Sequence, residues 1–148
     1  MAAARAGRML RVVTPDGPAD ERFGRSGDRV LVIEAIRLIP QAVMTDPHLN
    51  IVLTPFRAVD PGFISRTAPQ VVVAPLFGHG FDILDVCARL LRSNFRGRVI
   101  ALSHPLPDPE GVLHEIRGDA GAIEIDLIEV PKLPAARTAP PRLRRVPG

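Results

Sequence analysis

The side chains of this sequence that could do chemistry are histidines, a serine and an acid that stand at the ends of apolar runs. Ser103 and His104 close one run, Glu34 closes another, and His79 follows a third. If these runs are parallel strands, their carboxyl ends meet at one edge of a sheet, and the side chains converge there. Two imidazoles and a carboxylate suit a transition metal. The candidate ligand site comprises Glu34, Gly78, His79, Gly80, Ser103 and His104, and its metal set is His79, His104 and Glu34.

Simpler interpretations exist for each part of this site. The segment 77–80, Phe-Gly-His-Gly, lacks the third glycine of a dinucleotide fingerprint and the Gly-Lys-Ser/Thr ending of a P-loop, so it favours a tight turn. A Ser103–His104–Asp108 hydrolase is disfavoured because adjacent residues on a strand point to opposite sides. The Gly-x-Ser-x-Gly pattern is absent as well. We therefore predict a strand-to-helix turn and no bound cofactor.

Glu124 and Asp126 are a second candidate pair, two residues apart in an alternating segment at 122–129. This spacing places both carboxylates on one face of a strand. They could form a paired-carboxylate site, but the pattern favours the solvated face of an edge-like strand.

The segment 69–93 organises the rest of the chain. Val71–Ala74 is a run of apolar residues without polar alternation, which is typical of a strand buried on both faces. A loop at 75–81 leads to a helix that Asp82 can cap. Six apolar residues of that helix recur at helical spacing and form one stripe, Ile83, Leu84, Val86, Cys87, Leu90 and Leu91.

Further strands and helices alternate along the chain. A short helix with Pro40 in its first turn runs to about residue 45, one or two turns follow Asp60–Pro61, and a longer helix follows Asp108–Pro109. This alternation predicts βαβ units in an α/β fold, a five-stranded, doubly wound parallel sheet of flavodoxin-like order with short first and second helices. The other predicted strands are at 9–13, 29–34, 50–54, 99–103 and 122–129.

One domain is the natural count for 148 residues. We expect an N-terminal extension at 1–28 with room for one extra strand, the α/β domain at 29–131, and a disordered Pro/Arg-rich tail without a regular helix at 132–148. The single cysteine, Cys87, excludes an internal disulfide framework, and we find no signal-peptide or membrane-spanning pattern. These features predict a cytoplasmic protein.

The net charge of +3 comes from the two ends of the chain, while the middle is nearly balanced. Aromatic residues for stacking on bases are few. Nucleic acid is therefore not the expected partner. A contact of the tail with DNA, through Arg142, Arg144 and Arg145, is the alternative.

The segment PQVVVAPLFGHGFD and the order of elements at 29–131 resemble the receiver domain of bacterial response regulators, the signal-transduction modules of two-component systems. Gly80 and Asp82 fall where the family's loop after its third strand has Gly and Asp. The resemblance places Pro75 at the phosphoacceptor position, where the family carries an aspartate. Proline has no nucleophile, so aspartyl-phosphate chemistry cannot occur there.

Other positions implied by the resemblance are altered too. The acidic pair that holds Mg²⁺ in the family corresponds to Glu34–Ala35, with one carboxylate where two are usual. Ser103 matches the switch Ser/Thr. Glu129–Val130–Pro131 stands where a Lys-Pro pair is expected, so an acid replaces the cation. The receiver-equivalent positions are Glu34, Pro75, Ser103 and Glu129.

Receivers end in a further helix that packs on the sheet, and the proline-rich tail cannot supply it. We therefore expect a bare apolar face that a protein partner, a second copy in a homodimer or the N-terminal strand covers. The leading hypothesis is a non-enzymatic, phosphorylation-independent receiver-like module acting through protein contacts. The alternative is a small-molecule or metal-binding α/β domain, with or without enzyme activity, that uses the strand-end residues.

Overall fold

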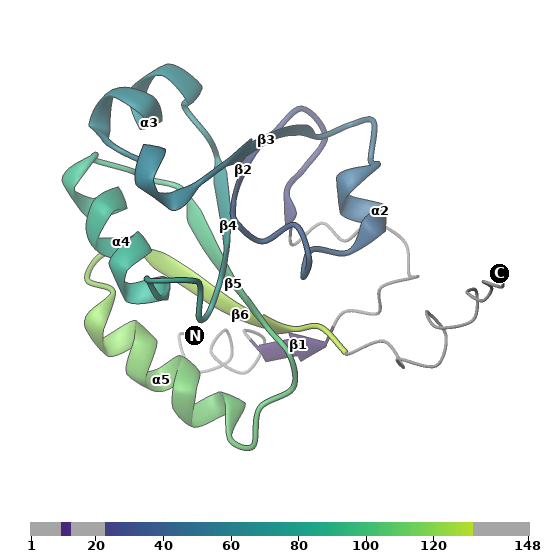
Figure 1. Cartoon of the computed structure of the whole chain (residues 1–148), viewed down its shortest axis with the longest axis vertical. Coiled ribbons are helices and arrows are strands. Elements are labelled where there is room, and N and C mark those ends of the chain that lie inside the picture. The colour runs from purple at the N-terminus through teal and green to yellow at the C-terminus, as the bar shows by residue number, and fades with distance from the viewer. Residues whose placement is uncertain (1–9, 13–22, 132–148) are drawn as a thin grey trace, which may run out of the picture.

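A computed structural model describes residues 10–12 and 23–131 of the chain (Figure 1). The described strands form one parallel sheet in the order β1-β6-β5-β4-β2-β3. The strands are β1 (Leu10–Val12), β2 (Arg29–Ile33), β3 (Asn50–Thr54), β4 (Val71–Pro75), β5 (Arg98–Ser103) and β6 (Glu124–Glu129). The helices are α2 (Gln41–Met44), η2 (Phe56–Ala58), α3 (Pro61–Thr67), α4 (Ile83–Arg92) and α5 (Pro109–Asp119).

The five predicted strands are present, and their order β3-β2-β4-β5-β6 is the flavodoxin-like order that the sequence predicts. Strand β1 extends this sheet beyond β6, with Leu10 opposite Leu127. The N-terminal segment therefore supplies the sixth strand. The predicted turn at 14–20 and the tail at 132–148 lie outside the described residues.

Local signals explain where the helices begin. Asp82 accepts a hydrogen bond from the Asp85 backbone N–H at 3.0 Å, and Asp85 accepts one from the Asp82 N–H at 2.9 Å, which forms a capping box for α4. Asp60 caps α3 by accepting a hydrogen bond from the Phe63 backbone N–H at 2.8 Å, and Pro61 stands at the first helical position. Helix α2 begins after Pro40 and has only four residues, so the short first helix is confirmed.

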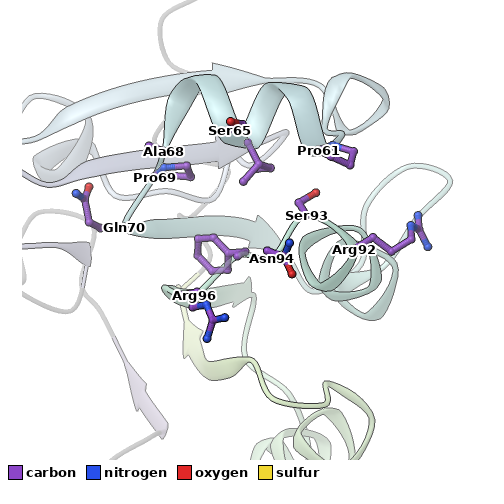
Figure 2. A pocket seen from close by; sticks show the side chains of 11 residues that line it. Pro61, Ser65, Ala68, Pro69, Gln70, Arg92, Ser93, Asn94 and Arg96 are labelled. Carbon is purple, nitrogen blue, oxygen red and sulfur yellow. The ribbon is translucent and has the colours of Figure 1, made fainter.

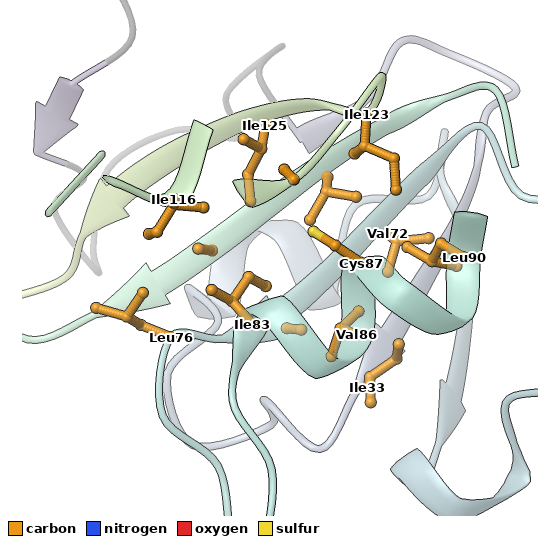
Figure 3. Packing of buried hydrophobic residues seen from close by; sticks show 14 of the residues in the cluster. Ile33, Val72, Leu76, Ile83, Val86, Cys87, Leu90, Ile116, Ile123 and Ile125 are labelled. Atoms are coloured by element: carbon orange, nitrogen blue, oxygen red, sulfur yellow. The ribbon is translucent and has the colours of Figure 1, made fainter. Parts of the chain in front are cut away.

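Helices α3, α4 and α5 cover one face of the sheet (Figure 1). Their buried side chains pack on those of the strands in one cluster, part of which Figure 3 shows around Val72, Val86 and Leu90. Cys87 lies within this cluster and is 1% exposed. Burial, with a smaller contribution from Asp82, raises the pKa of its thiol to about 11. The apolar stripe of α4 is therefore core, as its spacing predicts.

The opposite face of the sheet is buried as well, and part of the predicted N-terminal extension, Phe23, helps to cover it. Phe23 and the loop side chains Ile39 and Leu49 pack with Val43 of α2 against the strands. On the β5–β6 half of this face, buried side chains are at or close to zero exposure, namely Ile100, Leu102 and Ile128. The shortness of α2 therefore does not expose the strands that the sequence predicted to be uncovered.

Strand β6 is not an edge, because β1 pairs with its outer side. Glu124 is exposed, but Asp126 is half-buried and makes ion pairs with Arg98 at 3.6 Å and with Arg117 at 3.5 Å. The prediction of a solvated, edge-like strand is thus wrong for Asp126. Separately, none of the helices in the described part of the chain has the length and apolar character needed to cross a membrane.

Candidate functional site

The carboxyl edge of the sheet is where the receiver-equivalent positions lie, and Pro75 is the last residue of its central strand β4. Pairing of β4 with β2 ends at Val73, whereas pairing with β5 continues to Pro75 opposite Leu102. The Leu76 N–H donates to the Leu102 carbonyl at 2.8 Å, so the nitrogen of Pro75 faces the side where pairing with β2 has already ended. The missing N–H therefore interrupts no ladder bond, and proline is tolerated in a central strand.

Glu34 directly follows β2 and holds the loop after β3. Its Oε2 accepts a hydrogen bond from the Phe56 backbone N–H at 2.7 Å, and its own N–H donates to the Thr54 carbonyl at 3.1 Å. Glu34 has a φ of 49°, a left-handed conformation that costs energy for a residue with a side chain. Its carboxylate thus orders the start of η2, and Ala35 next to it offers no second acid.

Phe56 is held from the other side by α4. Its ring stacks on Phe81 with 4.4 Å between centroids and 8° between planes, and the Arg89 guanidinium carbon lies 4.0 Å from the Phe56 centroid. Arg89 also donates to the carbonyls of Phe56 at 2.9 Å and Val59 at 3.1 Å. Together with Glu34, these contacts fix the segment 55–59 against the sheet.

Glu129 ends β6 and holds the loop after β5. Glu129 is buried, with 8% of its surface exposed, but its carboxylate has a hydrogen-bond partner. Oε2 accepts a hydrogen bond from the Leu106 backbone N–H at 2.7 Å. Ser103, opposite Glu129 in the sheet, donates from Oγ to the His104 carbonyl at 2.6 Å. The switch-equivalent hydroxyl and the acid in the lysine position therefore both bind the β5–α5 loop.

The histidines predicted at this edge do not form a metal site. The His104 Nδ1 lies 3.2 Å from the Val130 carbonyl, so the ring is tied to the chain after β6. His79 is exposed in a tight turn, which the Gly78 N–H closes by donating to the Phe81 carbonyl at 2.8 Å. A tight turn is what the sequence of 77–80 predicts. Among the described residues, no group of three or more His, Cys, Asp or Glu could hold a metal ion. In the described part of the chain, His79, His104 and Glu34 are thus not among residues grouped for a metal ion.

Two surface pockets were missed by the sequence analysis. The larger, about 540 Å³, lies at the opposite edge of the sheet, between α3 and the segment after α4 (Figure 2). Arg92 and Arg96 line it, and neither guanidinium has a hydrogen-bond or ion-pair partner among the described residues. Ser65 and Asn94 add polar groups, and Ile64 an apolar one. No motif marks this pocket, because it joins segments about thirty residues apart.

The second pocket, about 350 Å³, lies where β2 and β3 end. Its lining is mostly apolar and includes Ile36 and Leu53, which are 54% and 55% exposed. Glu34 also lines it, so the only carboxylate in this pocket is the one already bonded to Phe56.

Comparisons with known proteins give fold-level similarity only. No family model and no curated protein matches the chain. A signal receiver domain of a protein described as a Luxo repressor, from Vibrio parahaemolyticus, is 20% identical over 75% of this chain and 83% of its own, with a TM-score of 0.48. The signal receiver domain of response regulator NarL from Mycobacterium tuberculosis is 20% identical over 70% of this chain and 85% of its own, with a TM-score of 0.49.

A short-chain dehydrogenase/reductase from Veillonella parvula is 13% identical over 81% of this chain and 67% of its own, with a TM-score of 0.36. These values are too low to transfer function. The receiver-like, flavodoxin-type fold of the chain rests on its own strand order, with β4 central and the receiver-equivalent residues at the carboxyl edge.

Proposed function

We propose that the protein is a non-enzymatic, receiver-like signalling or regulatory module that works without phosphorylation, through contacts with other proteins. The observation that carries this proposal is that the acids at the carboxyl edge of the sheet are engaged in hydrogen bonds to loops. Glu34 and Glu129 each bind a backbone N–H of a neighbouring loop, while Pro75 occupies the position between them in the sheet order.

Aspartyl phosphorylation requires a carboxylate nucleophile, a divalent cation held by several oxygens, and positive charge to balance the phosphoryl group. The side chain of Pro75 has no nucleophile, that of Ala35 has no oxygen to bind a cation, and Glu129 adds negative charge where a lysine would compensate it. Each requirement thus fails at a different residue. An edge whose polar groups fix loops is suited to presenting a constant surface, which favours a role as binding partner.

We further propose a cytoplasmic location, because a sequence with a single cysteine, Cys87, carries no internal disulfide framework and fits a reducing compartment. The predicted contact of the tail residues Arg142, Arg144 and Arg145 with nucleic acid falls outside the described residues. It would give binding with a steep salt dependence that is lost when residues 137–148 are removed.

The test is incubation of the whole chain with acetyl phosphate and Mg²⁺, followed by intact-mass measurement. A receiver domain that retains its aspartate is treated in parallel as the positive control. We expect a phosphoryl adduct on the control and none on this protein, and no change of its spectra with beryllofluoride and Mg²⁺. A stable adduct at the carboxyl edge of the sheet would overturn the proposal.

A second candidate function, binding of a small anionic molecule, is favoured by the pocket between α3 and α4. Arg92 and Arg96 line this pocket together with the apolar Ile64, and neither guanidinium has a hydrogen-bond or ion-pair partner among the residues that the structure describes. A guanidinium group binds phosphate or carboxylate groups through charge-assisted hydrogen bonds. This site replaces the strand-end histidines as the place where a small ligand would bind.

Dye-based thermal unfolding with inorganic pyrophosphate tests this candidate. Binding to the folded chain should raise the unfolding midpoint with the logarithm of ligand concentration above the dissociation constant, and the double variant Arg92→Ala/Arg96→Ala should abolish the rise. The matched control, Arg37→Ala/Arg57→Ala, removes two other exposed arginines and should keep it. An equal rise in all three proteins would indicate unspecific charge effects and exclude the pocket.

A further inference from the structure

The free edge of the sheet at β3 offers backbone groups for another strand. Among the strands that the structure describes, β3 is the last in the order and pairs with β2 on one side only. The Asn50 N–H donates to the Asp28 carbonyl at 2.9 Å, and the Thr54 carbonyl accepts from Glu34 at 3.1 Å. Because alternate residues of a strand bond to the same side, Val52 also faces β2, whereas the N–H and C=O groups of Ile51 and Leu53 point outward.

This edge lacks the features that usually prevent strands from pairing between molecules. The sequence of β3, NIVLT, contains no charged residue and no proline, and its pairing with β2 runs without a bulge from Arg29–Asn50 to Ile33–Thr54. Leu53 is 55% exposed on it. Leu53 and the equally exposed Ile36 line the pocket of about 350 Å³ described above. An unprotected edge thus lies beside an unfilled apolar pocket.

We propose that β3 pairs in antiparallel orientation with β3 of a second copy of this chain, about a twofold axis at Val52. In this register Ile51 lies opposite Leu53 of the partner subunit, and the two exchange both outward hydrogen bonds. The twofold axis generates a second, equivalent pair, in which Leu53 lies opposite Ile51 of the partner subunit. Asn50 lies opposite Thr54 of the partner subunit, so a polar pair closes each end. Two sheets join into one continuous sheet, and Leu53 and Ile36 are covered.

The sequence of the strand is the reason for choosing a second copy over an unrelated peptide. A twofold interface places a surface against itself, so like charges would repel and unequal side chains would leave gaps. Strand β3 has no charge to repel. Ile51 and Leu53, the two residues whose backbone groups point outward, have side chains of similar size. Opposing β-branched and aliphatic side chains stabilise antiparallel pairs. The strand is therefore complementary to itself.

This inference deepens the proposed function by naming the partner and the surface. It rests on the proposed function only where the contact is taken as a signalling contact. It also moves self-association away from the sheet face that the sequence predicted to be bare, because that face is buried within the chain. The interface is at β3, whereas phosphorylation concerns Pro75 in β4, so the two proposals fail independently.

The first experiment measures the mass of the full chain in solution by light scattering and by sedimentation over a range of concentrations. We expect a dimer that Leu53→Lys converts to a monomer, because the lysine places like charges near the axis. The matched control, Leu91→Lys, changes another partly exposed leucine, at 41% exposure on α4, and should leave the dimer intact. Circular dichroism shows whether each variant keeps its fold.

The second experiment fixes the register. In Val52→Cys the two cysteines meet at the axis as a non-hydrogen-bonded pair, with about 4.5 Å between Cα atoms, within the range of a disulfide. In Asn50→Cys the two copies are about 13 Å apart along the strand and cannot bond. We expect rapid oxidative cross-linking of the first variant and not of the second. The buried thiol of Cys87 does not compete.

A monomer at every concentration overturns the interface, as does a dimer that Leu53→Lys leaves intact. Equal cross-linking of both cysteine variants rejects the register and with it the twofold axis at Val52. A monomer that instead binds an extended peptide of another protein at this edge also overturns the proposal. If such a monomer still takes up no phosphoryl group, the proposed function stands without this interface.

Discussion

The carboxylate of Glu129 lies 2.7 Å from the backbone nitrogen of Leu106 and accepts its hydrogen bond. A buried acid here replaces the lysine that the resemblance to receivers implies, and it serves the loop between β5 and α5. A cation at this position could balance a phosphoryl group, whereas an acceptor holds an amide. The carboxylate of Glu129 thus acts as an anchor for the β5–α5 loop.

Removal of this acceptor should destabilise the protein. We expect Glu129→Ala to lower the free energy of unfolding by about 1–3 kcal/mol, because the Leu106 N–H loses its partner at a partly buried position. Glu129→Gln keeps an oxygen acceptor and should cost less. Urea unfolding followed by circular dichroism measures both. Glu124→Ala, on the same strand but exposed, should change stability by less than about 0.5 kcal/mol.

Restoring the aspartate alone should not restore phosphorylation. In Pro75→Asp the new carboxylate lacks a second Mg²⁺-binding acid at Ala35 and a cation at Glu129, so we expect no phosphoryl adduct with acetyl phosphate and Mg²⁺. The triple variant Pro75→Asp/Ala35→Asp/Glu129→Lys supplies all three groups and should give a detectable adduct by intact mass.

The control for this series is Pro75→Asn in the triple background, which has the same shape but no nucleophile. Circular dichroism identifies variants that fail to fold. An adduct on the single variant comparable to that on the triple would contradict our account, because it would mean that Glu34 alone suffices for the cation.

The fold could be predicted from the sequence because its signals are local. The unbroken apolar run before Pro75, the cap at Asp82 and the Asp60–Pro61 pair each act within a few residues, and the structure confirms them. The Glu34–Phe56 and Glu129–Leu106 bonds could not be predicted, since they join residues 22 and 23 positions apart. Their partners are backbone amides, which carry no sequence signature.

The errors have the same origin. Asp126 was assigned to a solvated face because alternation does not reveal Arg98 and Arg117, which reach it from β5 and α5. The packing of Phe23 on the sheet face beside the short α2 could not be assigned, because Phe23 lies far from that face in the sequence. Convergence of His79 with His104 was inferred from the shared sheet edge alone. Position at an edge does not fix where side chains point.

Cys87 should make stability depend on pH in the alkaline range. Burial raises the pKa of its thiol from 9.0 to about 11, so the unfolded chain loses the proton at a lower pH than the folded chain. The contribution of the buried thiol is fully present below pH 9.0 and is lost as the pH rises through about 11. We expect the free energy of unfolding to fall across this window.

This alkaline fall can be assigned to one group, because the chain has no tyrosine and Lys132 is its only lysine. Urea titrations at a series of pH values, compared between the natural chain and Cys87→Ala, measure it. The variant should be less stable at neutral pH, but its stability should change less between pH 9.0 and 11. An equal fall in both proteins would show that another group is responsible.

Arg89 should be sensitive even to a conservative change. Its guanidinium bonds the Phe56 and Val59 carbonyls at 2.9 and 3.1 Å while lying over the Phe56 ring. A lysine has neither the planar fork nor the stacking surface, so we expect Arg89→Lys to cost about 1–2 kcal/mol of stability. Hydrogen exchange of the amides in 56–59 should accelerate at the same time. Arg92→Lys, on the same helix but exposed, should leave both quantities unchanged, and equal losses in the two variants would refute the role of Arg89 in holding this loop.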